Sequence, residues 1–105
     1  MYILVRDDVP LGFAMVAVAH ASLACYLKFR ESPDVAAWLD GPFYKVVCRV
    51  DAREFERAKQ VDDHVVLTES ALDGREVAIA LKPREVWPNG FRFLRLYRSA
   101  PAMPA

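Results

Sequence analysis

Three side chains of this sequence are candidates for chemistry: the imidazole of His20, the ammonium group of Lys45 and the carboxylate of Glu69. An imidazole exchanges protons near neutral pH, an ammonium group stabilises negative charge, and a carboxylate can activate water. His20 lies in an apolar stretch, Lys45 in the middle of an expected strand, and Glu69 at the carboxyl end of another, where α/β folds place ligands. Each residue also has an interpretation without a functional role. His20 would then be a core histidine, Lys45 a lysine on an edge strand, and Glu69 a solvated turn residue.

A glycine and three cations are further candidate binding groups. Gly12 stands where a helix is expected to begin, and free N–H groups at a helix N-terminus attract anions, although a turn glycine is the alternative. The chain has fourteen basic and fourteen acidic residues, which excludes a uniformly basic nucleic-acid surface and confines any polyanion site to one region. Residues 82–98 hold five basic residues against one acid, and there we expect Lys82, Arg84 and Arg95 to contact phosphate.

The elements that must position these residues follow from hydrophobic periodicity. Strands are expected at residues 2–5, 43–50, 64–68 and 76–81, and helices at 11–29, 35–39 and 52–60. Asp51 and Glu54 have the spacing of a capping box, which turns Phe55 inward. Residues 11–27 have no formal charge but are slightly short for a membrane span. A core helix, covered on most sides by the sheet and by a neighbouring helix or subunit, is the better interpretation.

The element order β-α-α-β-α-β-β predicts an α/β fold, a three-layer sandwich with a four-stranded mixed sheet. Helices after the first two strands serve as crossovers, whereas the short turn between the last two strands makes them pair antiparallel. The length allows one domain, which we expect over residues 1–98, with 99–105 as a flexible tail. A thin core and an apolar helix favour a homodimer.

The two cysteines, Cys25 and Cys48, form neither a disulfide framework nor a metal-binding motif. We therefore expect two reduced core thiols. The first residues lack the charge and cleavage pattern of a signal peptide. These features predict a cytoplasmic protein without membrane contact.

Four segments resemble the type II peptidyl-tRNA hydrolases, in the right order along nearly the whole chain. Residues 15–24, MVAVAHASLA, resemble the first-helix signature, roughly G-K-[IL]-A-A-Q-x-x-H-A. KVV at 45–47, IALKP at 79–83 and LRLY at 94–97 resemble the family's K-V-V, L-G-I-G-P and L-K-L-Y. The likeness is closer to the divergent peptidyl-tRNA hydrolase domain-containing proteins, whose fourth strand ends A-L-[KR]-P and which have glutamate where the main family has aspartate.

The resemblance implies a dimeric α/β fold and hydrolysis of the ester between a peptide and the terminal ribose of tRNA, without metal or cofactor. His20 and Lys45 match family positions, and Glu69 most closely takes the place of the family's aspartate. On this basis Glu69 or His20 would assist the attack of water, Lys45 would stabilise negative charge, and the basic C-terminal segment would contact the tRNA.

Three polar positions of the family are apolar in this chain. The family's helix-start lysine corresponds to Phe13, its glutamine to Ala17 and its fourth-strand threonine to Val77. The replacements at Phe13 and Ala17 favour a non-catalytic domain that binds tRNA or a protein partner, whereas Lys45 and Glu69 favour the enzyme. The same replacements equally favour an uncharacterised protein of the same fold, since related small proteins of unassigned function begin their first helix with P-x-G, as residues 10–12 do here.

Overall fold

The sheet is built around the first strand of the chain. In the computed structural model, which describes residues 1–98, the strand order is β2-β1-β4-β3. β1 pairs in parallel with β2 and antiparallel with β4, which in turn pairs antiparallel with β3. The strands are β1 (Tyr2–Arg6), β2 (Val46–Val50), β3 (His64–Glu69) and β4 (Arg75–Leu81). The predicted mixed four-stranded sheet is confirmed.

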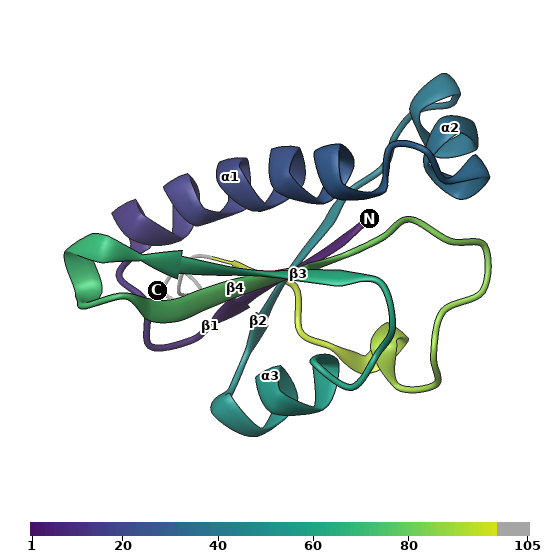
Figure 1. The fold of residues 1–105 in the computed structure, drawn as a ribbon. Coiled ribbons are helices and arrows are strands. Elements are labelled where there is room, and N and C mark those ends of the chain that lie inside the picture. The colour runs from purple at the N-terminus through teal and green to yellow at the C-terminus, as the bar shows by residue number, and fades with distance from the viewer. Residues whose placement is uncertain (99–105) are drawn as a thin grey trace, which may run out of the picture.

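Helices cover both faces of this sheet. α1 (Leu11–Phe29) lies on one face and α3 (Ala52–Ala58) on the other, as Figure 1 shows, while α2 (Pro33–Asp40) lies beyond one end of the sheet. Two short 3-10 segments complete the order, η1 (Ser70–Leu72) and η2 (Phe91–Phe93). The predicted α/β sandwich is therefore confirmed, whereas the predicted tail at 99–105 lies outside the described residues.

α1 packs on the sheet through a stripe of small residues. Its buried positions are Ala14, Ala17, Ala21 and Cys25. The small side chains allow the helix to lie close to the sheet, but nothing in the described chain covers its other side. No helix within residues 1–98 covers this side, and the predicted cover by a second subunit stays a prediction. By length and composition alone α1 could cross a membrane, a test that core helices also pass.

The capping box of α3 forms as predicted. The carboxylate of Asp51 accepts the Glu54 N–H at 2.7 Å, and Glu54 Oε1 accepts the Asp51 N–H at 2.9 Å. Because both terminal N–H groups are satisfied, the helix begins at Ala52 and directs Phe55, which is fully buried, into the core.

β2 begins three residues later than predicted, so Lys45 precedes the strand instead of lying within it. Phe43 has a left-handed backbone with φ 35°, which interrupts the extended conformation. The Tyr44 carbonyl then accepts hydrogen bonds from Trp38 Nε1 at 2.8 Å and from the Met1 amine at 3.0 Å. The Tyr44 main chain is therefore engaged by these contacts, although the hydrophobic alternation predicts it to be part of the strand.

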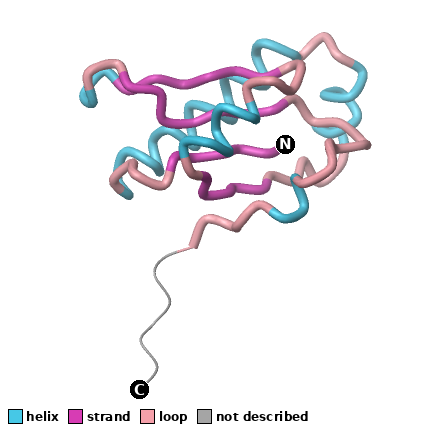
Figure 2. Tube along the Cα trace, turned by 90° about the horizontal axis from the view of Figure 1, so that it is seen from below, coloured by secondary structure: helices cyan, strands magenta, loops and turns pink. Residues whose placement is uncertain are grey.

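The segment at 94–98 runs along the outer edge of β2 (Figure 2). The Arg49 N–H donates to the Arg95 carbonyl at 2.9 Å, and the Tyr97 N–H donates to the Val47 carbonyl at 2.8 Å. Part of one sheet edge is thereby covered, which limits pairing of that edge with other chains.

Candidate functional site

The strand directions divide the predicted site residues between two ends of the sheet. The hairpin end consists of Arg6, Val50, Glu69 and Arg75, the last residues of β1, β2 and β3 and the first of β4. The opposite end, called the amino end, consists of Tyr2, Val46, His64 and Leu81. The N-terminus of α1 lies by the hairpin end (Figure 1).

Of the three candidate catalytic residues, Glu69 lies at the hairpin end. It is the last residue of β3 and lies opposite Arg75 in the sheet register. Its Oε1 accepts the Ala71 N–H at 3.0 Å and so caps η1. This bond fixes the carboxylate orientation, while Oε2 has no hydrogen-bond partner within residues 1–98.

Arg75 joins β4 to the loop between β1 and α1, and sequence reasoning did not single it out. Its Nη2 donates to the Asp8 carbonyl at 3.3 Å, and its Nη1 is 3.6 Å from Asp8 Oδ2. Arg6 Nη2 donates to the same carboxylate oxygen at 3.5 Å. Asp8 and Arg75 are 67 residues apart, so no local sequence pattern could have placed them together.

Gly12 lies in the first turn of α1 and is not a turn glycine. A Cβ at this position would meet nothing within 4 Å, so packing does not require glycine. Pro10 is the N-cap residue and no side chain caps this end of the helix. The first intrahelical bond joins the Ala14 N–H to the Pro10 carbonyl at 2.9 Å. The preceding N–H groups therefore remain available to an anion.

The three replaced family positions gather in one apolar cluster beside this end. Val77 and Ala17 are buried in it, and Phe13 packs against it. The register of β3 and β4 shifts next to Val77, which makes Val77 the extra residue of a bulge. Leu72, three residues beyond Glu69, packs on the same cluster. The apolar replacements are thus neighbours in space, close to the candidate carboxylate.

His20 belongs to neither end of the sheet. It lies on the exposed face of α1, about 12 Å along the helix axis from Gly12 at 1.5 Å per residue. The imidazole has no hydrogen-bond partner in the described part of the chain, so His20 is not the satisfied core histidine of the structural alternative.

Lys45 lies at the amino end, away from Glu69. β2 and β3 form opposite edges of the sheet, and the two residues are separated by roughly 15 Å along the strands as well. Lys45 Nζ lies 5.2 Å from the ring centroid of Trp38 and 4.5 Å from that of Phe43. His20, Lys45 and Glu69 therefore do not meet in one site, and the catalytic roles assigned to them stay predictions.

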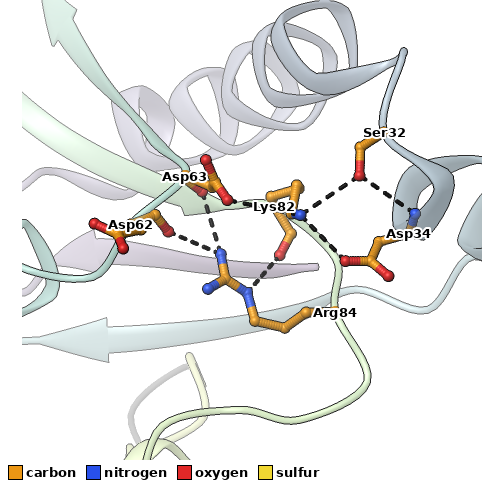
Figure 3. A network of polar contacts seen from close by, with 6 residues as sticks. All are labelled: Ser32, Asp34, Asp62, Asp63, Lys82 and Arg84. Atoms are coloured by element: carbon orange, nitrogen blue, oxygen red, sulfur yellow. Dashed lines mark hydrogen bonds and ion pairs between the residues drawn. The ribbon is translucent and has the colours of Figure 1, made fainter.

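Lys82, a predicted phosphate contact, is engaged by acidic residues of the protein itself. Its Nζ lies 3.1 Å from Asp34 Oδ2 and 3.6 Å from Asp63 Oδ2, and it also contacts Ser32 Oγ at 3.4 Å (Figure 3). The side chain is only 14% exposed. The basic excess of residues 82–98 is partly neutralised here by acids from earlier in the chain.

Arg84 and Arg95 also have partners within the chain. Arg84 donates to the main-chain carbonyls of Asp62 at 3.0 Å and Asp63 at 3.3 Å, and its Nε donates to the Lys82 carbonyl at 3.0 Å (Figure 3). Arg95 Nη2 lies 3.7 Å from a Glu54 carboxylate oxygen and its side chain remains mostly exposed. Lys82, Arg84 and Arg95 thus form no continuous free basic stripe.

The fold is that of an α/β protein with helices on both faces of a mixed sheet. A mixed sheet between helices holds a carboxylate, a guanidinium and an uncapped helix N-terminus at one end. The family model described as Peptidyl-tRNA hydrolase PTH2 matches residues 1–85, so the chain belongs to this family. Comparison with curated proteins found no matching relative. The predicted family is confirmed, and membership indicates a peptidyl-tRNA hydrolase-like function.

Proposed function

We propose that the protein hydrolyses peptidyl-tRNA at the hairpin end of its sheet. The family match over residues 1–85 carries this proposal. In the reaction, water adds to the ester carbonyl, the bond to the ribose oxygen breaks, and the products are a peptide carboxylate and a tRNA hydroxyl. Such a reaction needs a group that takes a proton from water and donors that stabilise the oxyanion.

Glu69 and the N-terminus of α1 supply groups of these kinds. One Glu69 oxygen is held by the Ala71 N–H, so the other can accept the proton of water. The uncapped N–H groups around Gly12 favour a phosphate or a developing oxyanion. Arg75 adds a guanidinium opposite Glu69. Lys45 has no part in this proposal because it lies at the amino end.

Release of the peptide from a peptidyl-tRNA analogue tests the proposal. We expect turnover by the wild-type protein and a loss of about 10²- to 10⁴-fold in Glu69→Gln, the contribution typical of general acid–base catalysis. Glu31→Gln is the matched control, since the Glu31 side chain is 96% exposed. No release above background by the wild-type protein would overturn the proposal.

A non-catalytic domain that binds tRNA or a protein partner is the second candidate. The apolar cluster of Phe13, Ala17 and Val77 favours it, because these replacements remove three polar groups beside the hairpin end. Retained tRNA affinity without turnover would support this candidate. Such binding should weaken steeply as the salt concentration rises, since phosphate contacts release counterions.

We also propose that the protein is a cytoplasmic homodimer that associates through the outer face of α1 and does not contact membranes. The face is apolar along most of the helix, and its exposed large residues are Leu11, Met15, Val16, Leu23 and Leu27. A surface of this kind marks an interaction site. A second copy presents the same face, as the symmetry of a two-fold dimer requires.

A further inference from the structure

A hollow at the amino end of the sheet takes no part in the proposed hydrolysis. Its volume is about 360 Å³, near the lower limit of the ~300–1,000 Å³ of small-molecule pockets. Four aromatic side chains from separate parts of the chain line it: Tyr2, Trp38, Tyr44 and Trp87. Both tryptophans of the sequence are among them. Aromatic rings gathered around a concave surface offer a flat ligand places to stack.

One wall of the hollow is rigid. Trp87 meets Tyr2 edge-on with 4.7 Å between ring centroids, and it stacks on Phe91 with 5.6 Å between centroids. On the α2 side, Trp38 Nε1 is fixed by its 2.8 Å bond to the Tyr44 carbonyl. The Tyr44 residue itself is 75% exposed. The hollow therefore combines packed aromatic walls with one exposed aromatic side chain, that of Tyr44.

The charge around these rings is positive. Lys45 lies over the ring of Trp38 and has no carboxylate partner within residues 1–98. The guanidinium carbon of Arg84 is 5.0 Å from the ring centroid of Trp87, and this group bonds only to main-chain carbonyls in the same described range.

Two acidic residues also line the hollow. Asp34 is neutralised by its ion pair with Lys82. Glu85 is exposed and has no ion-pair partner in the described part of the chain. Arg84 lines the hollow, and Lys45 lies beside it next to Trp38, so two cations stand near one free carboxylate. A cationic ligand would be repelled by the two basic groups that already cover the tryptophan rings, whereas a flat anion would be attracted.

We infer that this hollow binds a nucleotide, with its base stacked on Trp38 beside Tyr44 and its phosphate held by Lys45 and Arg84. The Lys45 ammonium is free to move, because its one hydrogen bond is a 3.4 Å contact with the Phe43 carbonyl. When the base takes the ring face of Trp38, the ammonium can shift to the phosphate. The inference does not rest on the proposed hydrolysis, since its residues lie at the opposite end of the sheet.

Tryptophan fluorescence tests this inference directly, because both tryptophans line the hollow. The full chain is titrated with adenosine 5′-monophosphate and, separately, with a short single-stranded oligoadenylate. A saturable change in emission with the mononucleotide would show that a free nucleotide is sufficient for binding. Saturable change with the oligonucleotide alone identifies a nucleotide within an RNA strand. Either result supports the inference.

Two exposed side chains allow variants that keep both reporters. Tyr44→Ala should weaken binding about 5- to 100-fold, the range expected for losing one stacking ring. Lys45→Ala should weaken it at least about fivefold and reduce its salt dependence. Arg53→Ala, which removes an exposed positive charge on α3, is the matched control and should bind as the wild type does.

Three outcomes would overturn the inference. The first is the absence of a saturable emission change with both probes. The second is wild-type affinity in both Tyr44→Ala and Lys45→Ala, with unfolding midpoints that show both variants to be folded. The third is equal weakening by Arg53→Ala, which would indicate general charge attraction instead of a built site.

Discussion

Individual residues of the hairpin end have roles that depend on their immediate neighbours. Glu69 is both the cap of η1 and a carboxylate at the same end of the sheet as the uncapped start of α1. Phe13, Ala17 and Val77 make the adjoining core cluster apolar. An apolar surrounding strengthens electrostatic interactions but supplies no hydrogen bonds of its own. The proposed hydrolysis therefore assigns the chemistry at this end to Glu69, Arg75 and main-chain N–H groups.

The two cysteines provide a prediction at the scale of single residues. Burial raises the pKa of both the Cys25 and the Cys48 thiol to about 11, from 9.0. Because the thiolate is the reactive form, we expect very slow modification of the native protein by a thiol reagent at pH 8, and rapid modification once denaturant unfolds it. Equal rates in the two states would contradict this prediction.

The same pKa shift links these thiols to stability. In the unfolded chain they ionise near pH 9, whereas in the folded chain they remain protonated until about pH 11. Deprotonation therefore favours the unfolded chain, and the free energy of unfolding should fall as the pH rises from 9 towards 11. Denaturant titrations across this range measure the effect.

At the scale of elements, local sequence patterns predict the helices well, but they predict the start of the second strand poorly. The capping box of α3 and the apolar run of α1 act within a few residues, so their positions follow from the chain itself. β2 starts late because Tyr44 is held by Trp38 and Met1, which are distant in sequence or on another element. The local alternation therefore predicts Lys45 inside the strand, whereas the structure places it just before β2.

The Lys82 side chain links two elements of the fold. It connects the end of β4 to the start of α2 through Asp34 and Ser32. We expect Lys82→Ala to lower the free energy of unfolding by about 1 kcal/mol, near the upper end of values for partly exposed ion pairs. Urea denaturation of this variant beside Arg53→Ala, which should remain within about 0.5 kcal/mol of wild type, measures the effect.

A different result would support the predicted contact between Lys82 and phosphate. Unchanged stability together with weakened tRNA binding in Lys82→Ala would mean that the ion pairs with Asp34 and Asp63 contribute little. It would also mean that the ammonium is available to an external anion.

For the whole molecule, the main feature is an apolar helix face left open by the fold. α1 uses its small residues to approach the sheet, which leaves its larger side chains outside. We expect sedimentation at micromolar concentration to show a dimer. Leu23→Glu should shift it to monomer, because a carboxylate in an apolar interface is desolvated without a partner.

Arg53→Glu, on α3 at the other face of the sheet, is the matched control and should remain dimeric. A wild-type protein that sediments only as monomer would remove the dimer proposal. Monomer that also co-floats with phospholipid vesicles would identify a membrane as what covers the outer face of α1.

The sequence by itself determined the fold class, the family and most of the elements, because apolar periodicity, caps and motifs are local properties of the chain. Only the tertiary structure decided which residues meet. Because of the strand directions, Glu69 lies at the hairpin end and Lys45 at the amino end. At the hairpin end Arg75 forms a hydrogen bond with Asp8. The physical reason is that pairing between distant strands depends on contacts across the whole fold, which no short stretch of sequence contains.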